Sequence, residues 1–177
     1  MSSNAYARIE EERRFLLAAL PKDVPADSPI TRIHDRYING TRLRLRRFES
    51  PSGEPVAFKL GQKFSLGEDG VRTQMTTFYL DEAEYDTLAA LPALTLTKRR
   101  HAYEYDGLVF SLDAFEGPLA GLVLAELEAR PGVDLPAVAV PAFAVREVTA
   151  DPQFTGGRLV RLTAAEATPW LAAALAQ

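Results

Sequence analysis

The sequence has no cysteine, and it has only two histidines among its 177 residues. Without cysteine there are no disulfides, no thiolate metal sites and no cysteine nucleophile. The histidines, His34 and His101, are too few to build a histidine-rich metal centre. These absences exclude metal sites based on sulfur or on clustered imidazoles, and they exclude thiol catalysis.

Long apolar runs are also missing. No segment approaches the roughly 20 apolar residues that cross a membrane as a helix. The first five residues lack the charged and apolar regions of a signal peptide. A net charge of −4 argues against a nucleic-acid coat protein. We therefore expect a soluble cytoplasmic protein with no membrane or nucleic-acid partner.

The length suits one domain over residues 1–177, and 47% hydrophobic residues are normal for a globular protein. Short strand-like segments follow one another between turn signals. Helices are predicted at 81–91, with Asp81 as the N-cap, and near 163–175, where Pro169 could split the helix. Strands are predicted at 6–16, 31–38, 41–49, 54–63, 71–80, 94–105, 107–115 and 122–130.

Turn signals fix how these strands connect. Asn39-Gly40 and Asp106-Gly107 predict hairpin turns, and the proline-containing stretch 21–29 predicts a loop. Shorter turns are predicted at 50–53 and 67–70. Eight sequential antiparallel strands favour a closed barrel, because closure removes exposed edges. The predicted fold is mainly β (α+β), an eight-stranded antiparallel barrel with helices packed outside.

A row of charges marks the first predicted strand. Residues two apart share one face of a strand, so Glu10, Glu12 and Arg14 stand about 7 Å apart on one side. Like charges so placed repel each other. A strand keeps such a row when a metal ion or a charged ligand sits between the charges. A solvated strand face explains this segment alone equally well.

Other predicted strands repeat this two-faced pattern. In 122–130, two glutamates share one face and three apolar side chains share the other. An ordinary half-buried sheet explains any one such strand, but five strands with paired or tripled charges fit it less well. We therefore expect the charged faces to line the barrel and to surround a polyanion with its metal ion. The charged sets beyond the first strand are Arg42, Arg44 and Arg46; Lys59 and Lys63; Lys98 and Arg100; Asp113; and Glu126 and Glu128.

The ordered series resembles a known family. Glu10-x-Glu12-x-Arg14 is similar to the Glu-x-Glu-x-Lys signature of the CYTH domain superfamily, the triphosphate tunnel metalloenzymes. The resemblance extends from about residue 8 to about 162. It runs through the segments 35–46, 58–63, 98–100, 112–117, 121–128 and 146–154.

The resemblance implies a tunnel that binds triphosphate-containing substrates with Mg²⁺ or Mn²⁺. Activities of the family include inorganic, thiamine and nucleoside triphosphatase and class IV adenylyl cyclase, so the fold does not choose the reaction. The implied substrate-binding residues are Arg42, Arg44, Arg46, Lys59, Lys63, Arg72, Lys98 and Arg100. The implied metal ligands are Glu10, Glu12, Glu126 and Glu128, and Asp113 is a further metal ligand or a residue of the charged network. The implied catalytic residues are Glu10, Glu12, Arg14, Glu126 and Glu128.

Two departures from the family pattern leave alternatives open. Arg14 replaces the signature lysine and cannot easily exchange a proton. The strand 72–80 has no carboxylate where the family often has acids, and we single out Gln74 and Thr76. Metal-dependent hydrolysis of a linear triphosphate, inorganic tripolyphosphate first, is the leading hypothesis. An adenylyl cyclase and a catalytically weak triphosphate-binding module are the alternatives, and a homodimer is left open.

Several prominent residues are not assigned to the site. His34 and His101 are expected to be ordinary surface or network residues, and Trp170 is expected to anchor the last helix on the barrel. The tyrosines are expected to pack within strands, although a stacking role for one of them would favour a nucleotide substrate. These tyrosines are Tyr37, Tyr79, Tyr103 and Tyr105.

Overall fold

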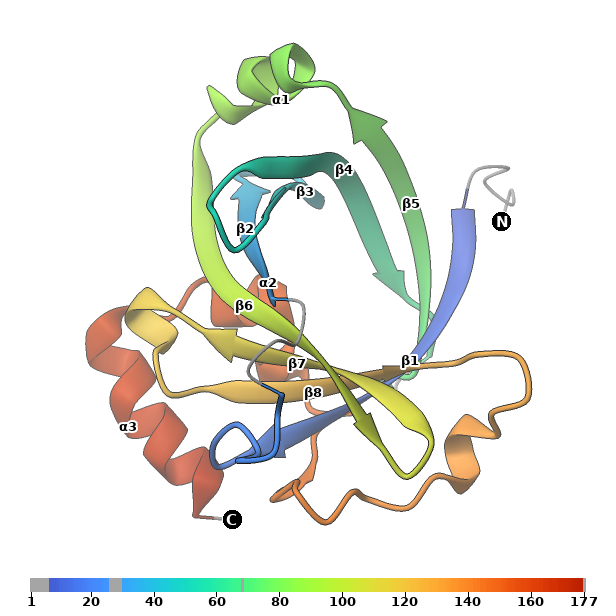
Figure 1. Cartoon of the computed structure of the whole chain (residues 1–177). Helices are drawn as coiled ribbons and strands as arrows, with labels where there is room; N and C mark the ends of the chain where they lie inside the picture. Colours follow the sequence, from blue (N-terminus) through green and yellow to red (C-terminus); the bar gives the residue numbers. More distant parts are fainter. Residues whose placement is uncertain (1–6, 26–29, 68, 177) are drawn as a thin grey trace.

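Eight antiparallel strands close into a barrel in the computed structural model, which describes residues 7–25, 30–67 and 69–176 (Figure 1). The predicted barrel is confirmed, and every described strand end lies within two residues of its predicted position. Tyr6, the first residue of the first predicted strand, and residues 1–5 and 26–29 lie outside the described residues. The strands are β1 (Ala7–Leu17), β2 (Ile30–Ile38), β3 (Leu43–Glu49), β4 (Pro55–Ser65), β5 (Arg72–Leu80), β6 (Ala93–Tyr105), β7 (Leu108–Phe115) and β8 (Val123–Glu128).

Strand β1 closes the barrel by pairing with two strands at once. Its first half, residues 7–11, pairs with β5, and its second half, residues 12–17, pairs with β8. Beyond Glu11, β1 no longer pairs with β5. A two-residue strand, β9 (Arg146–Glu147), pairs with this edge of β1 instead, and the sequence analysis did not predict it. The segment with the Glu-x-Glu-x-Arg row therefore lies at the seam of the barrel.

The outward faces of the strands are apolar and covered. On β3, Leu43 and Leu45 pack with Tyr85 and Leu88 of helix α1 (Glu82–Ala89). On β1 and β8, Phe15 and Leu127 pack under the chain that follows β8, which includes Phe143 and the short helix η2 (Leu135–Ala137). Burying these faces outside leaves the opposite, charged faces of the same strands to line the interior.

The predicted helices form, with one correction. Asp81 caps α1 in a capping box, as its position before Glu84 indicates. Helix α3 (Ala164–Leu175) runs without a break through Pro169, so the suggested split does not occur. Proline removes only one backbone donor there, and Trp170 and Leu171 beside it pack on the core. In the described residues, no helix is long and apolar enough to cross a membrane.

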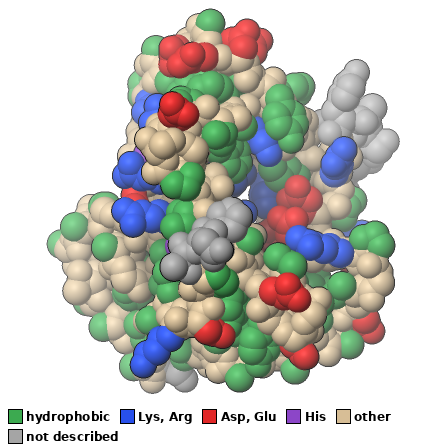
Figure 2. All heavy atoms as spheres, in the orientation of Figure 1, with side chains coloured by type: hydrophobic (Ala, Val, Ile, Leu, Met, Phe, Trp, Pro, Cys, Tyr) green, Lys and Arg blue, Asp and Glu red, His purple; other side chains and the backbone are tan. Residues whose placement is uncertain are grey.

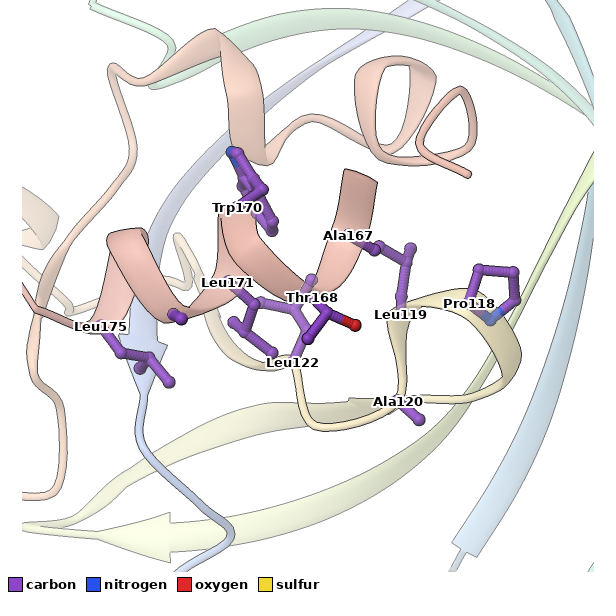
Figure 3. A pocket seen from close by; sticks show the side chains of 10 residues that line it. Pro118, Leu119, Ala120, Leu122, Ala167, Thr168, Trp170, Leu171 and Leu175 are labelled. Carbon is purple, nitrogen blue, oxygen red and sulfur yellow. The ribbon is translucent and has the colours of Figure 1, made fainter. Parts of the chain in front are cut away.

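Trp170 anchors α3 as predicted. Its ring centroid lies 5.1 Å from that of Phe154, which belongs to helix η3 (Pro152–Phe154). Its Nε1 donates to Gln153 at 3.0 Å. Next to it, α3 and the short helix η1 (Gly117–Leu119) line an open, mainly apolar pocket of about 240 Å³ (Figure 3).

One end of the barrel is closed by the C-terminal segment. Leu16, Leu96, Phe115 and Leu124, all at this end, form one core with η3, α3 and the short helix α2 (Gly156–Leu159). The strands alternate in direction, so the other end is formed by the last residues of β3, β5 and β8. We call this other end the open mouth.

The predicted turns are found, with one difference in length. Asp106 and Gly107 both have positive φ, 51° and 72°, as a two-residue hairpin requires. Gly40 has φ 73°, but β2 and β3 are joined by residues 39–42 rather than by two residues. Of the predicted turn at 67–70, Glu68 lies outside the described residues.

Gly70 joins the turn before β5 to the segment after β9. Its φ is +70°, and a Cβ at this position would lie 2.2 Å from the Thr149 carbonyl oxygen. Glycine is therefore needed both for the backbone conformation and for the close approach. This contact ties the β4–β5 turn to the seam at β1.

We expect Gly70→Ala to lower the free energy of unfolding by about 2–5 kcal/mol, since it adds backbone strain and overpacking together. Gly40→Ala is the matched control, because Gly40 has nearly the same φ but open space around its Cβ position. The control should lose only about 1–2 kcal/mol. Urea unfolding measures the free energy of unfolding of both variants. Equal losses would show that the close approach to Thr149 does not affect stability.

Candidate active site

Strand register brings the predicted charges together inside the barrel. Directly opposed residues of neighbouring strands share a face, and these pairs include Arg14 with Glu126, Arg46 with Lys59, and Arg100 with Asp113. Figure 2 shows Lys or Arg and Asp or Glu side chains gathered in the hollow on this face of the molecule. The predicted residues that share the inner face are Glu10, Glu12, Arg14, Arg44, Arg46, Lys59, Lys63, Lys98, Arg100, Asp113, Glu126 and Glu128.

Asp35 holds two of the arginines from β2. Arg46 donates to it through Nε at 2.5 Å and Nη2 at 2.7 Å, and Arg44 Nε lies 3.7 Å away. The carboxyl is 2% exposed. Burial raises its pKa, but Arg46 and Arg44 outweigh that effect and lower the pKa to about 2. Asp35 is therefore a permanent anion that orients both guanidinium groups.

The sequence reasoning did not assign Asp35. Its segment belongs to the resemblance, but Asp113 was the only aspartate assigned to the site. The available signal was its period-2 relation to Ile33 and Tyr37, which puts a carboxylate on a face whose neighbours are apolar or aromatic. Such a carboxylate needs a cation on a neighbouring strand, and Arg46 is its direct partner on β3.

Asp113 performs the same task on β7, two strands away from β2 in the sheet. It is fully buried and forms ion pairs with Lys98 and Arg100. Arg100 binds it through two nitrogens, at 2.7 and 2.6 Å, and also reaches Glu126 at 2.5 Å. In this arrangement Asp113 positions two cations, as expected of the network role that was left open beside metal binding.

Glu126 links this cluster to β1. Its carboxylate lies 3.5 Å from Arg14 Nε, and Arg14 also binds Glu12 at 2.7 Å. Burial raises the pKa of Glu126, but Lys98, Arg100 and Arg14 together hold it well below its usual range. Glu126 is therefore ionised at any working pH and is a weak base.

Lys63 binds the remaining carboxylates of β1. Its Nζ lies 3.2 Å from Glu10 and 3.6 Å from Glu12. Glu12 is buried, while Glu10 is more exposed and Glu128 lies exposed at the open mouth. Cations and carboxylates thus alternate from Lys63 across the seam to Arg100.

Lys59 differs from the other inner cations. Within the described residues no ion pair joins it to a carboxylate. Its Nζ lies instead between two aromatic rings, 4.9 Å from the Phe48 centroid and 4.8 Å from the Tyr79 centroid. Such cation–π contacts hold an ammonium group without neutralising its charge.

Two predicted ligands are not brought to the inner cluster. Arg72 lies on the outer face of β5, where its Nε pairs with Glu11 at 3.1 Å. Arg42 precedes β3 and is exposed, with its guanidinium 4.1 Å from the Phe64 ring centroid. The alternation of side chains along β5 explains why Arg72 points outward. Thr73 pairs with inward-facing Glu10, so the residue before it faces the other side of the sheet.

The same alternation changes which residues of β5 are compared with the acids of the family pattern. Gln74 and Thr76 share the outer face with Arg72, so acids at these positions would not line the tunnel. The inner face of β5 carries Thr73, Met75, Thr77 and Tyr79. It has no carboxylate either, so the departure from the family pattern persists on the face that matters.

The residues left unassigned occupy ordinary sites. His34 lies on the outer face, with Nε2 2.7 Å from Glu49. His101 is nearly buried, and burial and Arg99 lower its pKa. Tyr103 and Tyr105 pack in the outer core with Phe143.

A polar chain fixes Arg14 from outside the barrel. Arg13, which points outward, binds Glu147 at 2.6 and 3.0 Å. Glu147 accepts from the Thr149 hydroxyl at 2.6 Å, and that hydroxyl accepts from the Arg14 amide at 2.9 Å. The hydrogen bond from Arg13 outweighs burial and lowers the pKa of Glu147. The β9 segment thus holds the backbone that carries the inner charges.

The carboxylates of β1 and β8 fit a divalent cation by their chemistry and register. Glu12 and Glu128 are direct partners, and opposed like charges are unfavourable without a cation between them. Mg²⁺ and Mn²⁺ take such oxygen ligands. No three acidic or histidine side chains converge within the described part of the chain. Glu12 and Glu126 turn instead toward Arg14, Lys63 and Arg100.

Asp35 makes stability depend on pH in a defined direction. Its pKa falls from 3.8 to about 2 on folding, so it stabilises the fold fully above pH 3.8 and loses this effect as pH falls toward 2. The contribution is roughly 2 kcal/mol. We expect Asp35→Asn to weaken this acid dependence and to cost about 3–5 kcal/mol at pH 7, since it leaves buried arginines unpaired. Urea unfolding from pH 7 to pH 2 tests this, and an unchanged acid dependence would contradict it.

Comparison with known proteins gives a match in structure only. No protein-family model matches the chain, and no curated protein matches it. Two crystal structures of the protein NE1496 are similar to it. One, described as a hypothetical protein, is 23% identical with a TM-score of 0.58, covering 87% of this chain and 99% of that one. The other, described as the inorganic triphosphatase NE1496, is 22% identical with a TM-score of 0.56, covering 85% and 93%. This likeness shows the fold: the chain has the same barrel fold as NE1496, and the barrel that the resemblance to the CYTH domain superfamily implied is thereby confirmed.

Proposed function

We propose that the barrel binds a linear triphosphate and hydrolyses it with the help of a divalent metal ion. The observation that carries the proposal is the inner set of cations, which face the interior of the barrel from β1, β3, β4 and β6. Most of them are fixed by buried carboxylates. A chain of phosphates is a ligand with enough charge, spread over enough length, to contact cations on all of these strands.

The arginines supply binding that is already organised. The fork of Arg46 is held in one plane by its two bonds to Asp35, and Arg100 is held in the same way by Asp113. A fixed guanidinium loses little conformational freedom when it binds a phosphate oxygen. Because Asp35 and Asp113 are buried, these contacts act in a medium of lower dielectric than water.

The carboxylates of β1 and β8 are proposed to hold Mg²⁺ or Mn²⁺. Glu10, Glu12, Glu126 and Glu128 are the candidate ligands, and the metal would neutralise charge on the phosphates and orient a water molecule. A bound triphosphate would compete for Lys63 and Arg14. Phosphate oxygens that take up these cations would leave the oxygens of Glu12 and Glu126 available.

Hydrolysis needs no covalent nucleophile in this arrangement. A water oxygen attacks a phosphorus atom as the bond to the bridging oxygen breaks, with attacking and leaving oxygens roughly in line. The proton lost by the water passes to a phosphate oxygen of the products. The low pKa of Glu126 makes it a poor general base, and Arg14 stays protonated. The barrel would therefore act by positioning the phosphates and stabilising charge.

The first test is phosphate release from tripolyphosphate, ATP and thiamine triphosphate, each with Mg²⁺, Mn²⁺ or EDTA. We expect turnover of tripolyphosphate that depends on the metal and stops in EDTA. Turnover without metal would contradict the mechanism. Thermal stabilisation by triphosphate without turnover would favour a binding module, consistent with the absence of carboxylates on the inner face of β5. Cyclic AMP formed from ATP would indicate a cyclase.

We expect Glu126→Gln to lower metal-dependent turnover by on the order of 100-fold or more, because it removes a charged ligand of the metal. The exposed residue Glu82, on α1 outside the barrel, gives the matched control Glu82→Gln. Steady-state kinetics across a metal titration measures the effect, and circular dichroism checks the fold. Near wild-type turnover in Glu126→Gln would remove Glu126 from the site.

We expect Arg44→Ala to raise KM about 10- to 100-fold, the effect of one lost hydrogen bond to a charged group, with a smaller change in kcat. Arg99→Ala is the control, because Arg99 is an exposed arginine that pairs with Glu116 on the outer face. Equal effects of the two variants on KM would mean that the binding depends on overall charge and not on the tunnel.

A further inference from the structure

The open mouth carries an exposed aromatic ring on its inner side. Tyr79 is the penultimate residue of β5 and pairs directly with Lys59, which shares the inner face with Arg46. The residue is 74% exposed. An aromatic side chain packed only for stability would be expected to bury more of its ring.

The ring of Tyr79 has one occupied face and one free face. Lys59 Nζ lies over this ring, 4.8 Å from its centroid, and it also lies 4.9 Å from the centroid of the Phe48 ring. With Lys59 on one face, the large exposure of Tyr79 leaves the opposite face open to solvent. A flat ligand ring could stack there, directly beside a cation that has no carboxylate partner among the described residues.

Phe48 also faces inward, but it is only partly exposed and has both Lys59 and Arg46 over its ring. The other described tyrosines discussed above and Trp170 do not face the tunnel mouth. Tyr37 lies in the closed end, packed with the C-terminal segment against Gly156. Tyr103 and Tyr105 belong to the outer core. Trp170 packs on Phe154 outside the barrel. Tyr79 is thus the tyrosine positioned for the stacking role that the sequence left open.

We propose that Tyr79 stacks on the flat heterocycle of a ring-bearing triphosphate, while Lys59 binds the phosphate nearest to that ring. This inference rests on the proposed function, and it extends the substrate class from bare tripolyphosphate to triphosphates that carry a heterocycle at one end. The closed end is filled by Leu96, Phe115 and Phe154, so the phosphate tail enters first and the ring remains at the open mouth. Stacking is tolerant of ring identity, so purine and thiamine rings should both bind.

The experiment compares ring-bearing and bare ligands in the same variants. We expect Tyr79→Ala to reduce kcat/KM for ATP and thiamine triphosphate about 5- to 100-fold, because one stacked ring is lost. The same substitution should change kcat/KM for tripolyphosphate by less than about threefold, because this ligand has no ring to stack. Tyr79→Phe should retain both activities, because it keeps the ring. Phe78→Ala is the matched control, since Phe78 is 54% exposed on the outer face of the same strand.

The same variants are titrated with the three ligands by calorimetry in EDTA, where no turnover is required. A ring-specific loss of affinity supports the stacking role even if no hydrolysis is found, so the two proposals fail separately. An equal loss for tripolyphosphate would show that Tyr79 only positions Lys59 and would overturn the inference. Unchanged affinity of Tyr79→Ala for every ligand would also overturn it.

Discussion

The tunnel depends on buried carboxylates that hold cations pointing inward. Asp35 binds Arg44 and Arg46, and Asp113 binds Lys98 and Arg100. Cations crowded inside a barrel repel each other and would oppose folding. The two aspartates offset this repulsion, because each lies directly opposite its arginine on the neighbouring strand. An empty barrel can therefore be stable and still present positive charge to a ligand.

Stability and function are divided between the two faces of the same strands. Leu45 and Leu127 point outward and are fully or almost fully buried under helix α1 and the chain after β8. Their neighbours in sequence, Arg46 and Glu126, point inward. A protein with an apolar barrel interior would obtain its core there, whereas this one builds its cores outside and at the closed end. The covering segments are accordingly structural supports for the wall of the site.

The seam at β1 concentrates the groups that suit a metal ion. Residues 7–11 pair with β5 and residues 12–17 with β8, so the Glu-x-Glu-x-Arg row spans the point where the barrel closes. The hydrogen-bonded chain from Arg13 through Glu147 and Thr149 to the Arg14 amide fixes this point from outside. The charged groups of the seam are in this way held by a segment, 146–149, that is distant from them in sequence.

The two-faced strands, the closed barrel and most of the inner residues could be predicted from the amino-acid sequence, because a period of two assigns each side chain to a face without knowledge of its partners. The sequence by itself could not determine the partners. Register decided that Asp35 lies opposite Arg46, that Asp113 binds cations, and that Arg72, Gln74 and Thr76 face outward. Tertiary packing kept α3 continuous through Pro169 and left Tyr79 exposed beside Lys59. These outcomes depend on contacts between residues far apart in the chain, and such contacts exist only after the barrel has closed.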